Sequence, residues 1–398
     1  MSAHTSVPST STLQSESPAG LHCVVDDFDH AQVPVRDRWL RLFDRSTRTR
    51  VHHHPDYAIA SLPERGGPGW TVTCCDGDDP QGMAIMIPKH CRLGRQVLPG
   101  ARSSRWGARL AGFGLLGSDD ESVVDCLVET LAEQMRMRSI PVMEFEEIEE
   151  VSNLWRSLRR LSSQGFRFVP SSDFAPHHRI RLPNSPEEYW CTFKSKRRNA
   201  LRKERERFGN YALERLTAAA NIDRWLTDAK AISDKSWQSQ RFGPRVSNND
   251  DERRFLTFLA TMGALRAYML HREGEPVAFV MGHQWKGVYH YDEVGFDRNL
   301  VNLAPGKVLL QEILDDLLTF DRPDVFDFGL GDGGYKQFFA NEQSRSATLW
   351  MFPPGSHAVW QVASIILRRT LGRQARAILE RTGLYETLRR RLKDNAAD

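Results

Sequence analysis

The sequence lacks the long apolar runs that a membrane-spanning helix needs. No stretch of its 398 residues approaches the roughly 20 consecutive apolar residues that cross a bilayer. Its first residues also lack the hydrophobic core of a secretion signal. We therefore expect a cytoplasmic protein.

A strong excess of one charge is missing as well. The chain has 54 Lys and Arg against 51 Asp and Glu, so its formal net charge is only +3. This balance does not by itself indicate a nucleic-acid partner. With 40% hydrophobic residues, a chain of this length can form two domains that each bury a core.

The cysteine pattern of metal and disulfide proteins is also absent. The six cysteines form no C-x-x-C pair and have no histidines at zinc-finger spacing. We expect free thiols, with neither a metal site nor a disulfide framework. Residues His52, His53 and His54 are consecutive, so they cannot all face one ion from a helix or strand. They are interpreted as a polar loop before Pro55.

A glycine pattern at residues 112–117 has the form G-x-G-x-x-G. A dinucleotide site needs a buried strand just before this pattern and an acidic residue about 20 positions later. Residues 105–111 are too charged for such a strand. We interpret the glycines as part of a loop.

The same order of elements occurs in both halves of the chain: antiparallel strands, a helix, then a strand. This repetition predicts an α/β (α+β) protein of two related units, each with a mixed, mostly antiparallel sheet flanked by helices. The first copy spans 70–88, 121–137, 140–145 and 154–161, and the second spans 265–295, a helix from Pro305, and 324–328. In the predicted helix 121–137, one face carries Val124, Leu127, Val128 and Leu131. Within 265–295, hairpin turns are expected at residues 273–274 and 286–287.

We divide the chain into four parts. Residues 1–20 are rich in Ser, Thr and Pro and are expected to be disordered. Two domains follow, at 21–175 and 176–355. Residues 356–398 form a basic, amphipathic helical tail, which either packs on the second domain or lies on an anionic membrane surface.

The most basic stretch of the chain is a predicted helix at 194–207. One interpretation is a solvated helix face, and the other is a clamp for a polyanion, because guanidinium groups bind phosphates bidentately. Arg197 and Arg198 are its candidate substrate-binding residues. Trp237, an aromatic residue among polar neighbours, could form the wall of a pocket or belong to the core.

Several short motifs occur in a specific order. They are KRRNALR at 196–202, Trp237, GEPVA at 274–278, APG at 304–306, DFG at 327–329 and YK at 335–336. This order resembles the acetyltransferase-like proteins of the GNAT superfamily of the CelD (cellulose biosynthesis) type, which are related to the Fem-type aminoacyl transferases. The resemblance covers residues 20–355 and is strongest over 185–340.

The resemblance implies two tandem GNAT-like units, the first degenerate and the second carrying the site. It also implies acyl transfer from acyl-CoA (acetyl-CoA) to an amine or hydroxyl of a polysaccharide or cell-envelope precursor. Two alternatives stay open. One is a Fem-type transferase that uses aminoacyl-tRNA, and the other is a non-catalytic GNAT-like module that binds a partner.

The candidate donor site is the start of the helix at Pro305. A helix N-terminus offers unpaired N–H groups and a positive dipole end, which suit a pyrophosphate. Leu303 and Val308 depart from the usual GNAT phosphate loop, which keeps the tRNA donor open. The candidate cofactor-binding residues are Ala304, Pro305, Gly306, Lys307, Val308 and Lys336.

Transfer to an amine needs a base and donors for the developing oxyanion. Asp292 and Glu293 lie on the third strand of the second unit, and alternation places them on opposite faces, so that one at most points into the site. His283 and His290 are further candidates. Asp332 could cap the glycine-rich turn or orient the acceptor, beside Tyr335 as a substrate-binding residue.

Overall fold

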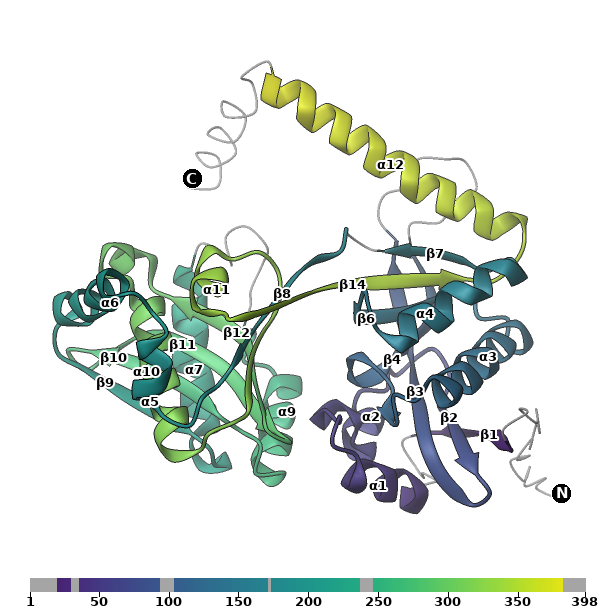
Figure 1. The fold of residues 1–398 in the computed structure, drawn as a ribbon, viewed down its shortest axis with the longest axis horizontal. Helices are drawn as coiled ribbons and strands as arrows, with labels where there is room; N and C mark the ends of the chain where they lie inside the picture. The colour runs from purple at the N-terminus through teal and green to yellow at the C-terminus, as the bar shows by residue number, and fades with distance from the viewer. Residues whose placement is uncertain (1–19, 30–35, 94–103, 171–172, 237–245, 382–398) are drawn as a thin grey trace, which may run out of the picture. The chain divides into compact units, whose positions relative to one another are not determined.

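The computed structural model describes residues 20–29, 36–93, 104–170, 173–236 and 246–381 (Figure 1). The chain forms two compact units: unit 1 contains residues 1–174 and 346–398, and unit 2 contains residues 175–345. Residues 346–355, expected from the sequence in the second domain, therefore belong to unit 1. Apart from Gly20, the tail expected to be disordered lies outside the described residues.

Unit 1 contains a mixed sheet with the strand order β1-β2-β3-β4-β6-β14, in which β5 also pairs with β3 and β7 with β14. All of these pairs are antiparallel except β4 with β6. The strands are β1 (Leu21–Phe28), β2 (Gly69–Asp76), β3 (Asp79–Arg92), β4 (Ser104–Leu110), β5 (Leu116–Gly117), β6 (Met143–Glu149), β7 (Arg167–Pro170) and β14 (Glu342–Phe352).

Helix α3 (Glu121–Met137) packs against β1, β2 and β3 and against α4 (Asn153–Arg160). The four apolar residues expected on one face of this helix are all buried, which confirms the amphipathic pattern: Val124, Leu127, Val128 and Leu131. The remaining helices of unit 1 are α1 (Arg36–Arg45), α2 (Pro55–Ala60), α12 (Ser356–Arg381) and the short 3-10 turns η1 (Val51–His53), η2 (Ala111–Phe113) and η3 (Leu161–Gln164).

Two glycines of the 112–117 pattern, Gly112 and Gly114, border a buried histidine. His53 is 2% exposed, and its Nε2 lies 3.2 Å from the carbonyl oxygen of Gly114. Gly112 has φ +74°, and a Cβ at this position would overlap the His53 ring. The histidine run is therefore not a polar loop, because η1 places its middle residue in the core of unit 1.

The strands of unit 2 are also mixed in direction and follow the order β8-β13-β12-β11-β10-β9. Only β12 and β13 are parallel. The strands are β8 (Ala175–Arg181), β9 (Tyr211–Leu216), β10 (Ala267–Arg272), β11 (Glu275–Trp285), β12 (Val288–Phe296) and β13 (Val325–Leu330). The helices are α5 (Pro186–Cys191), α6 (Ser195–Phe208), α7 (Ile222–Lys235), α9 (Asp250–Thr261), α10 (Pro305–Phe320), α11 (Gly334–Phe339) and the turns η4 (Ala219–Asn221) and η5 (Arg298–Leu303).

Two tight turns set the register of the β10–β11–β12 meander. Residues Glu273 and Gly274 both have positive φ, and so do Lys286 and Gly287. Two successive positive φ values define the type I′ turn, whose twist matches that of a two-stranded hairpin. Both turns lie where the sequence predicts them.

Helices cover both faces of the sheet in unit 2. On β11, Val280 packs with Leu309 of α10 in one apolar cluster. The next residue back, Phe279, stacks edge-on against Trp225 of α7 at a ring distance of 5.9 Å. Because neighbouring residues of a strand point to opposite faces, α10 and α7 lie on opposite sides of the sheet.

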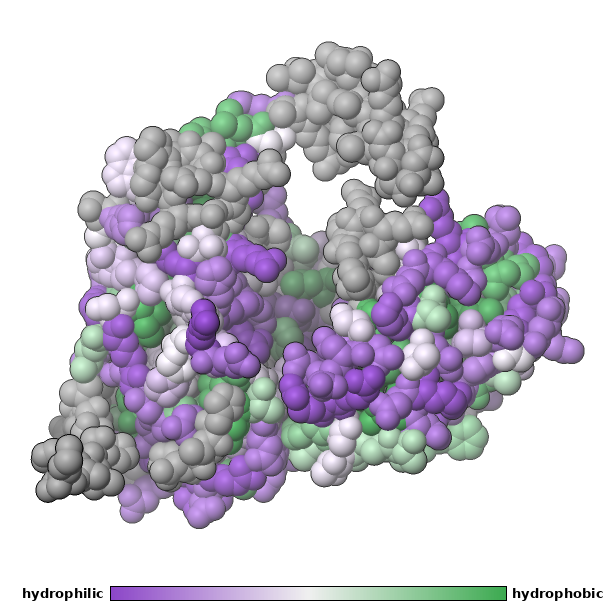
Figure 2. Space-filling view, turned by 180° about the vertical axis from the view of Figure 1, so that it is seen from behind, coloured by the Kyte–Doolittle hydropathy of each residue, from purple (hydrophilic) through white to green (hydrophobic). Residues whose placement is uncertain are grey.

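Helix α12 packs in unit 1 through Ala358 and Ile365, which share a cluster with Val169 of β7. Apolar side chains are also visible on the surface of this helix (Figure 2). Among the described residues, no helix is long and apolar enough to span a membrane. The predicted contact of this tail with a membrane surface stays a prediction. Among the α12 residues whose side chains are described, the large apolar residues Val359, Trp360, Ile366, Leu367 and Leu371 are exposed.

The buried imidazole of His53 makes the stability of unit 1 depend on pH. Burial lowers the pKa of His53 to about 4, whereas an unfolded histidine has a pKa of about 6.5. Between these values the unfolded chain binds a proton that the folded chain does not. The free energy of unfolding should therefore fall by up to about 3 kcal/mol as the pH drops through this window.

Urea unfolding at pH 7.5, 5.5 and 4.5 measures this effect. We expect His53→Gln to be less stable than the wild type at pH 7.5 and to lose less stability on acidification. His357→Gln, at an exposed position, is the matched control and should behave as the wild type. Equal pH slopes for the wild type and His53→Gln would refute the role of His53.

Candidate active site

A β-bulge lies where the base candidates of unit 2 occur. Along β11, Met281 pairs with Glu293 of β12, but the next residue, Gly282, pairs with Tyr291. Asp292 is thus an extra residue in β12, and a bulge of this kind breaks the alternation of faces. Glu293 shares the face of its partner Met281, and therefore that of His283.

Asp292 reaches the same face from the bulge. Its Oδ2 lies 2.7 Å from Nδ1 of His283. The expectation that Asp292 and Glu293 point to opposite faces is therefore wrong, because it assumed an uninterrupted strand. Both carboxylates lie on the side of the sheet that carries His283.

The pair of His283 and Asp292 has a buried end and an exposed end. The His283 side chain is 2% exposed, and that of Asp292 is 45% exposed. His283 stacks on His290 with ring centroids 4.6 Å apart. The carboxylate is therefore the part of this pair that a substrate from solvent can reach, while the imidazoles lie behind it.

Polar residues also occupy the paired positions on the next two strands after His290. His290 pairs with Asp327 of β13, which in turn pairs with Arg179 of β8. The Asp327 carboxylate lies 2.5 Å from Nε2 of His177 and accepts hydrogen bonds from Arg179 (3.3 Å) and from the N–H of Gly329 (2.7 Å). Asp327 is thus a buried, fully engaged carboxylate, and its contacts fix the strand end next to His290.

The two parallel strands of unit 2 pair only briefly. The register of β12 with β13 covers residues 288–290 and 325–327, and β12 continues to Phe296 without β13 as a partner. The bulge at Asp292 begins two residues after the last pair. The second half of β12, which carries Asp292 and Glu293, therefore has no β13 partner.

Helix α10 begins next to this unpaired half of β12. As expected from the sequence, its first residue is Pro305, after Ala304 in the left-handed conformation (φ 54°). No side chain caps this N-terminus. The N–H groups of Lys307 and Val308 both donate to the carbonyl of Ala304, at 3.0 and 3.1 Å. A Cβ on Gly306 would meet only Phe296 of β12, at ordinary contact distance.

The corresponding helix of unit 1 begins differently. Like α10, α3 connects two parallel strands, β4 and β6, which pair over only two residues. Its N-cap is Asp120, whose carboxylate accepts from the N–H of Ser122 at 2.9 Å. Hydrogen bonds from Ser122 lower the pKa of Asp120, and Asp119 and Glu121 flank it. An anion would be repelled at this helix start, whereas α10 carries no acidic residue in its first turn.

The predicted cationic residues meet around α11. The Arg197 guanidinium of α6 lies 3.3 Å from the ring centroid of Phe338 and donates to the carbonyl of that residue. The Lys307 amine lies 5.8 Å from the same ring and 3.1 Å from Oε1 of Glu204. Lys336 donates to the carbonyls of Phe328 and Leu330 at the end of β13, at 2.7 and 2.8 Å. These contacts fix α6, α10 and α11 relative to one another.

The other predicted substrate-binding residues are dispersed. Arg198 donates to the carbonyl of Phe193 at 2.8 Å. The Asp332 side chain is 71% exposed and lies 3.9 Å from His178. The ring centroids of Tyr335 and Tyr291 lie 6.4 Å apart, on the α10 side of the sheet. Trp237 lies outside the described residues. The binding roles of these residues stay predictions.

The spacing of apolar residues in β12 indicates the bulge, although strict alternation of faces does not predict it. The residues of β12 that pack with α10 are Tyr289, Tyr291, Val294 and Phe296. Their spacing is two, three, two, and the extra step falls at Asp292. His177 and Arg179 were also missed, because they lie about 150 residues from Asp327 in the sequence and only strand pairing brings them together.

Comparison with known proteins supports this architecture. Residues 195–337 match the family model described as an acetyltransferase (GNAT) domain. No curated protein matches the chain. The crystal structure of FemX matches with a TM-score of 0.52 at 10% identity, over 71% of this chain and 87% of that one.

Two further solved structures cover nearly their whole length. A tandem GNAT protein from the clavulanic acid biosynthesis pathway has a TM-score of 0.50 at 12% identity, over 84% of this chain and 99% of that one. A protein of unknown function from Bacteroides thetaiotaomicron has a TM-score of 0.51 at 12% identity, over 82% and 99%. The finer resemblance to CelD-type proteins stays a prediction. Residues 195–337 are thus similar to a GNAT acetyltransferase domain, and the chain shares the mixed α/β fold of a tandem GNAT protein.

Proposed function

We propose that the chain is an acyltransferase whose site lies in unit 2, and that it transfers an acyl group from acyl-CoA to an amine or hydroxyl. The observation that carries the proposal is the early end of β12–β13 pairing beside the uncapped start of α10. An opening between two strands can hold the thioester arm of a donor. The N–H of Gly306 and the helix dipole would then face its phosphates.

The bulge supplies the chemistry in this proposal. Asp292 is the base: its carboxylate takes the proton of the attacking amine while His283 holds it in place through Nδ1. The amine nitrogen bonds to the thioester carbon, and the C–S bond breaks as coenzyme A leaves. The extra residue of a bulge is left out of the strand ladder, so the N–H of Asp292 is our candidate donor to the oxyanion. Glu293, on the same face, is the alternative base.

The acceptor assignment rests on the order of sequence motifs. Their resemblance to CelD-type proteins supports a polysaccharide or cell-envelope precursor that carries an amine or hydroxyl. We therefore choose glucosamine as the probe acceptor.

A second candidate donor, aminoacyl-tRNA, is favoured by the exposed face of α6. Of the exposed cations on α6 and its N-cap, only Arg202 forms an ion pair within the part of the chain that the structure describes. The others are Lys194, Lys196, Arg198, Lys203 and Arg207. Such a surface suits a phosphate backbone. Binding of tRNA would then weaken steeply with salt, because each neutralised phosphate releases counterions.

Removing the proposed base should slow the reaction without weakening donor binding. We expect Asp292→Asn to lower kcat by a factor of about 10² to 10⁴ with an unchanged KM for acetyl-CoA, since general-base catalysis contributes this much. Release of the coenzyme A thiol in the presence of glucosamine measures the rate. Glu275→Gln, at an exposed position on β11, is the control. If Glu293→Gln alone lowers kcat, the base is Glu293.

The donor site is tested by a charge at the start of α10. In Gly306→Glu the new carboxylate favours the helix N-terminus but repels the donor phosphates, so acetyl-CoA binding should weaken at least tenfold with the fold retained. Gly306→Gln has the same size without the charge, and we expect it to bind more tightly than Gly306→Glu. Isothermal titration calorimetry measures both.

The wild type decides between the two donors. Failure to bind acetyl-CoA would refute the acyl-CoA donor. In that case, salt-sensitive binding of aminoacyl-tRNA that is lost when Lys196 and Lys203 are both replaced by Glu would support the Fem-type alternative. A protein that binds neither donor would refute both.

A further inference from the structure

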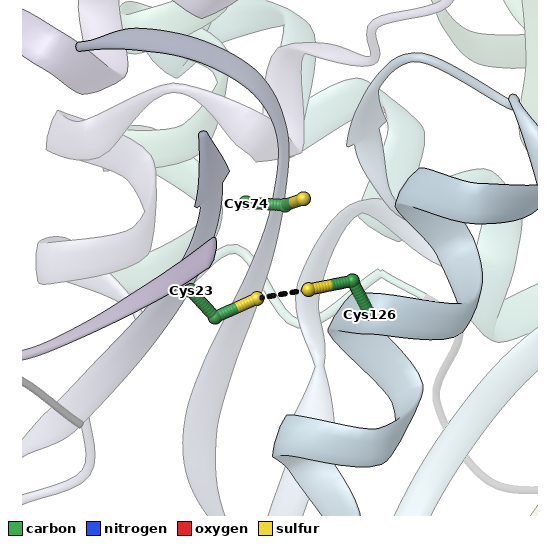
Figure 3. A group of neighbouring side chains, drawn as sticks. All are labelled: Cys23, Cys74 and Cys126. Atoms are coloured by element: carbon green, nitrogen blue, oxygen red, sulfur yellow. Dashed lines mark hydrogen bonds between the residues drawn. The ribbon is translucent and has the colours of Figure 1, made fainter. Parts of the chain in front are cut away.

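Three buried cysteines of unit 1 converge on one point (Figure 3). Cys23 lies on β1, Cys74 on β2 and Cys126 on α3, with exposed fractions of 1%, 0% and 7%. Their sulfur atoms all lie within 4.8 Å of one another, and the thiols of Cys23 and Cys126 form a hydrogen bond with a sulfur–sulfur distance of 3.1 Å. All three are free thiols.

The fold, not the spacing in the sequence, produces this group. Cys23 and Cys74 are direct partners in the antiparallel β1–β2 pair, so their side chains share a face. That face is the one that α3 covers, and Cys126 points from α3 toward Cys23 (Figure 3). The neighbouring Cys75 points to the other face of β2 and takes no part.

The size of the group fits a single thiophilic ion. Three sulfurs that bind one ion at about 2.3 Å lie about 3.8–4.0 Å apart, by the geometry of trigonal or tetrahedral sites. The present spread of up to 4.8 Å, with one pair at 3.1 Å, needs only small side-chain shifts to reach this arrangement. Carboxylates and imidazoles do not complete the group among the described residues, so the donors are sulfur alone.

We propose that Cys23, Cys74 and Cys126 bind one soft metal ion through three thiolates. Such ligands select Cu(I) or Zn(II) over Mg(II), Ca(II) or Mn(II). Structural zinc sites are almost always closed by four ligands, whereas Cu(I) is commonly stable with three, so we place Cu(I) first. On binding, each thiol gives its proton to solvent, and no electron is transferred.

The surroundings determine both the selectivity and the effect of the ion. The group lies in the apolar core of unit 1, next to Val25 and Val72, so the charge of three thiolates needs a cation to offset it. A bound ion would link β1, the edge strand of the sheet, to β2 and α3 and so stabilise unit 1.

Metal titration of the full chain tests the proposal. The protein is purified with reductant and without oxygen, then titrated with Cu(I) in competition with a chelator and, separately, with Zn(II). We expect one equivalent to bind. The single variants Cys23→Ser, Cys74→Ser and Cys126→Ser should each weaken binding at least tenfold, while the control Cys75→Ser should leave it unchanged. The two affinities, compared with each other, test the preference for Cu(I) over Zn(II).

A second measurement avoids variants that fail to fold. X-ray absorption of the wild type loaded with Cu(I) or Zn(II) should show three sulfur neighbours at about 2.2–2.3 Å. Fewer than three sulfurs with both ions would overturn the proposal. So would equal binding by the wild type and the triple serine variant.

Discussion

The brief pairing of β12 with β13 is the constraint on which unit 2 depends. The pairing ends after three residues, and the rest of β12 pairs with β11 only. The bulge at Asp292 lies in this part of β12, which pairs with β11 only. Helix α10 begins beside Phe296, the last residue of β12. The buried contacts of Asp327 with His177 and Arg179 hold the other strand. One local loss of pairing thus positions a carboxylate and a helix start beside the same opening.

The N-termini of α3 and α10 occupy corresponding places in the two units but differ in their suitability for an anion. Each unit connects a briefly paired parallel strand pair with a helix, α3 in unit 1 and α10 in unit 2. In unit 1 the N–H groups at the helix start face the carboxylate of Asp120, which stabilises the helix. In unit 2 no side chain takes that position. A single N-cap residue therefore separates a helix start that is satisfied internally from one that can accept a ligand.

Local signals predicted much of the fold and part of the site. The glycine turns at 274 and 287, the apolar stripe of α3 and the start of α10 at Pro305 all depend on residues close in sequence, and all occur as expected. The contact of His283 with Asp292 was not predicted, since it requires the bulge. The convergence of Cys23, Cys74 and Cys126 was missed for a related reason: strand register and helix packing bring distant residues together, and no spacing rule encodes either.

Unit 2 is inserted into the chain of unit 1, which leaves at residue 174 and returns at residue 346. The part of β14 that pairs with β6 and β7, residues 346–352, is therefore made only after all of unit 2. During synthesis unit 2 can fold as soon as it emerges, while the sheet of unit 1 waits for its last strand with one edge open. Such a delayed, long-range pairing slows folding and exposes an unpaired edge to other chains. The ribosome thus completes the two units in the reverse of the order in which it begins them.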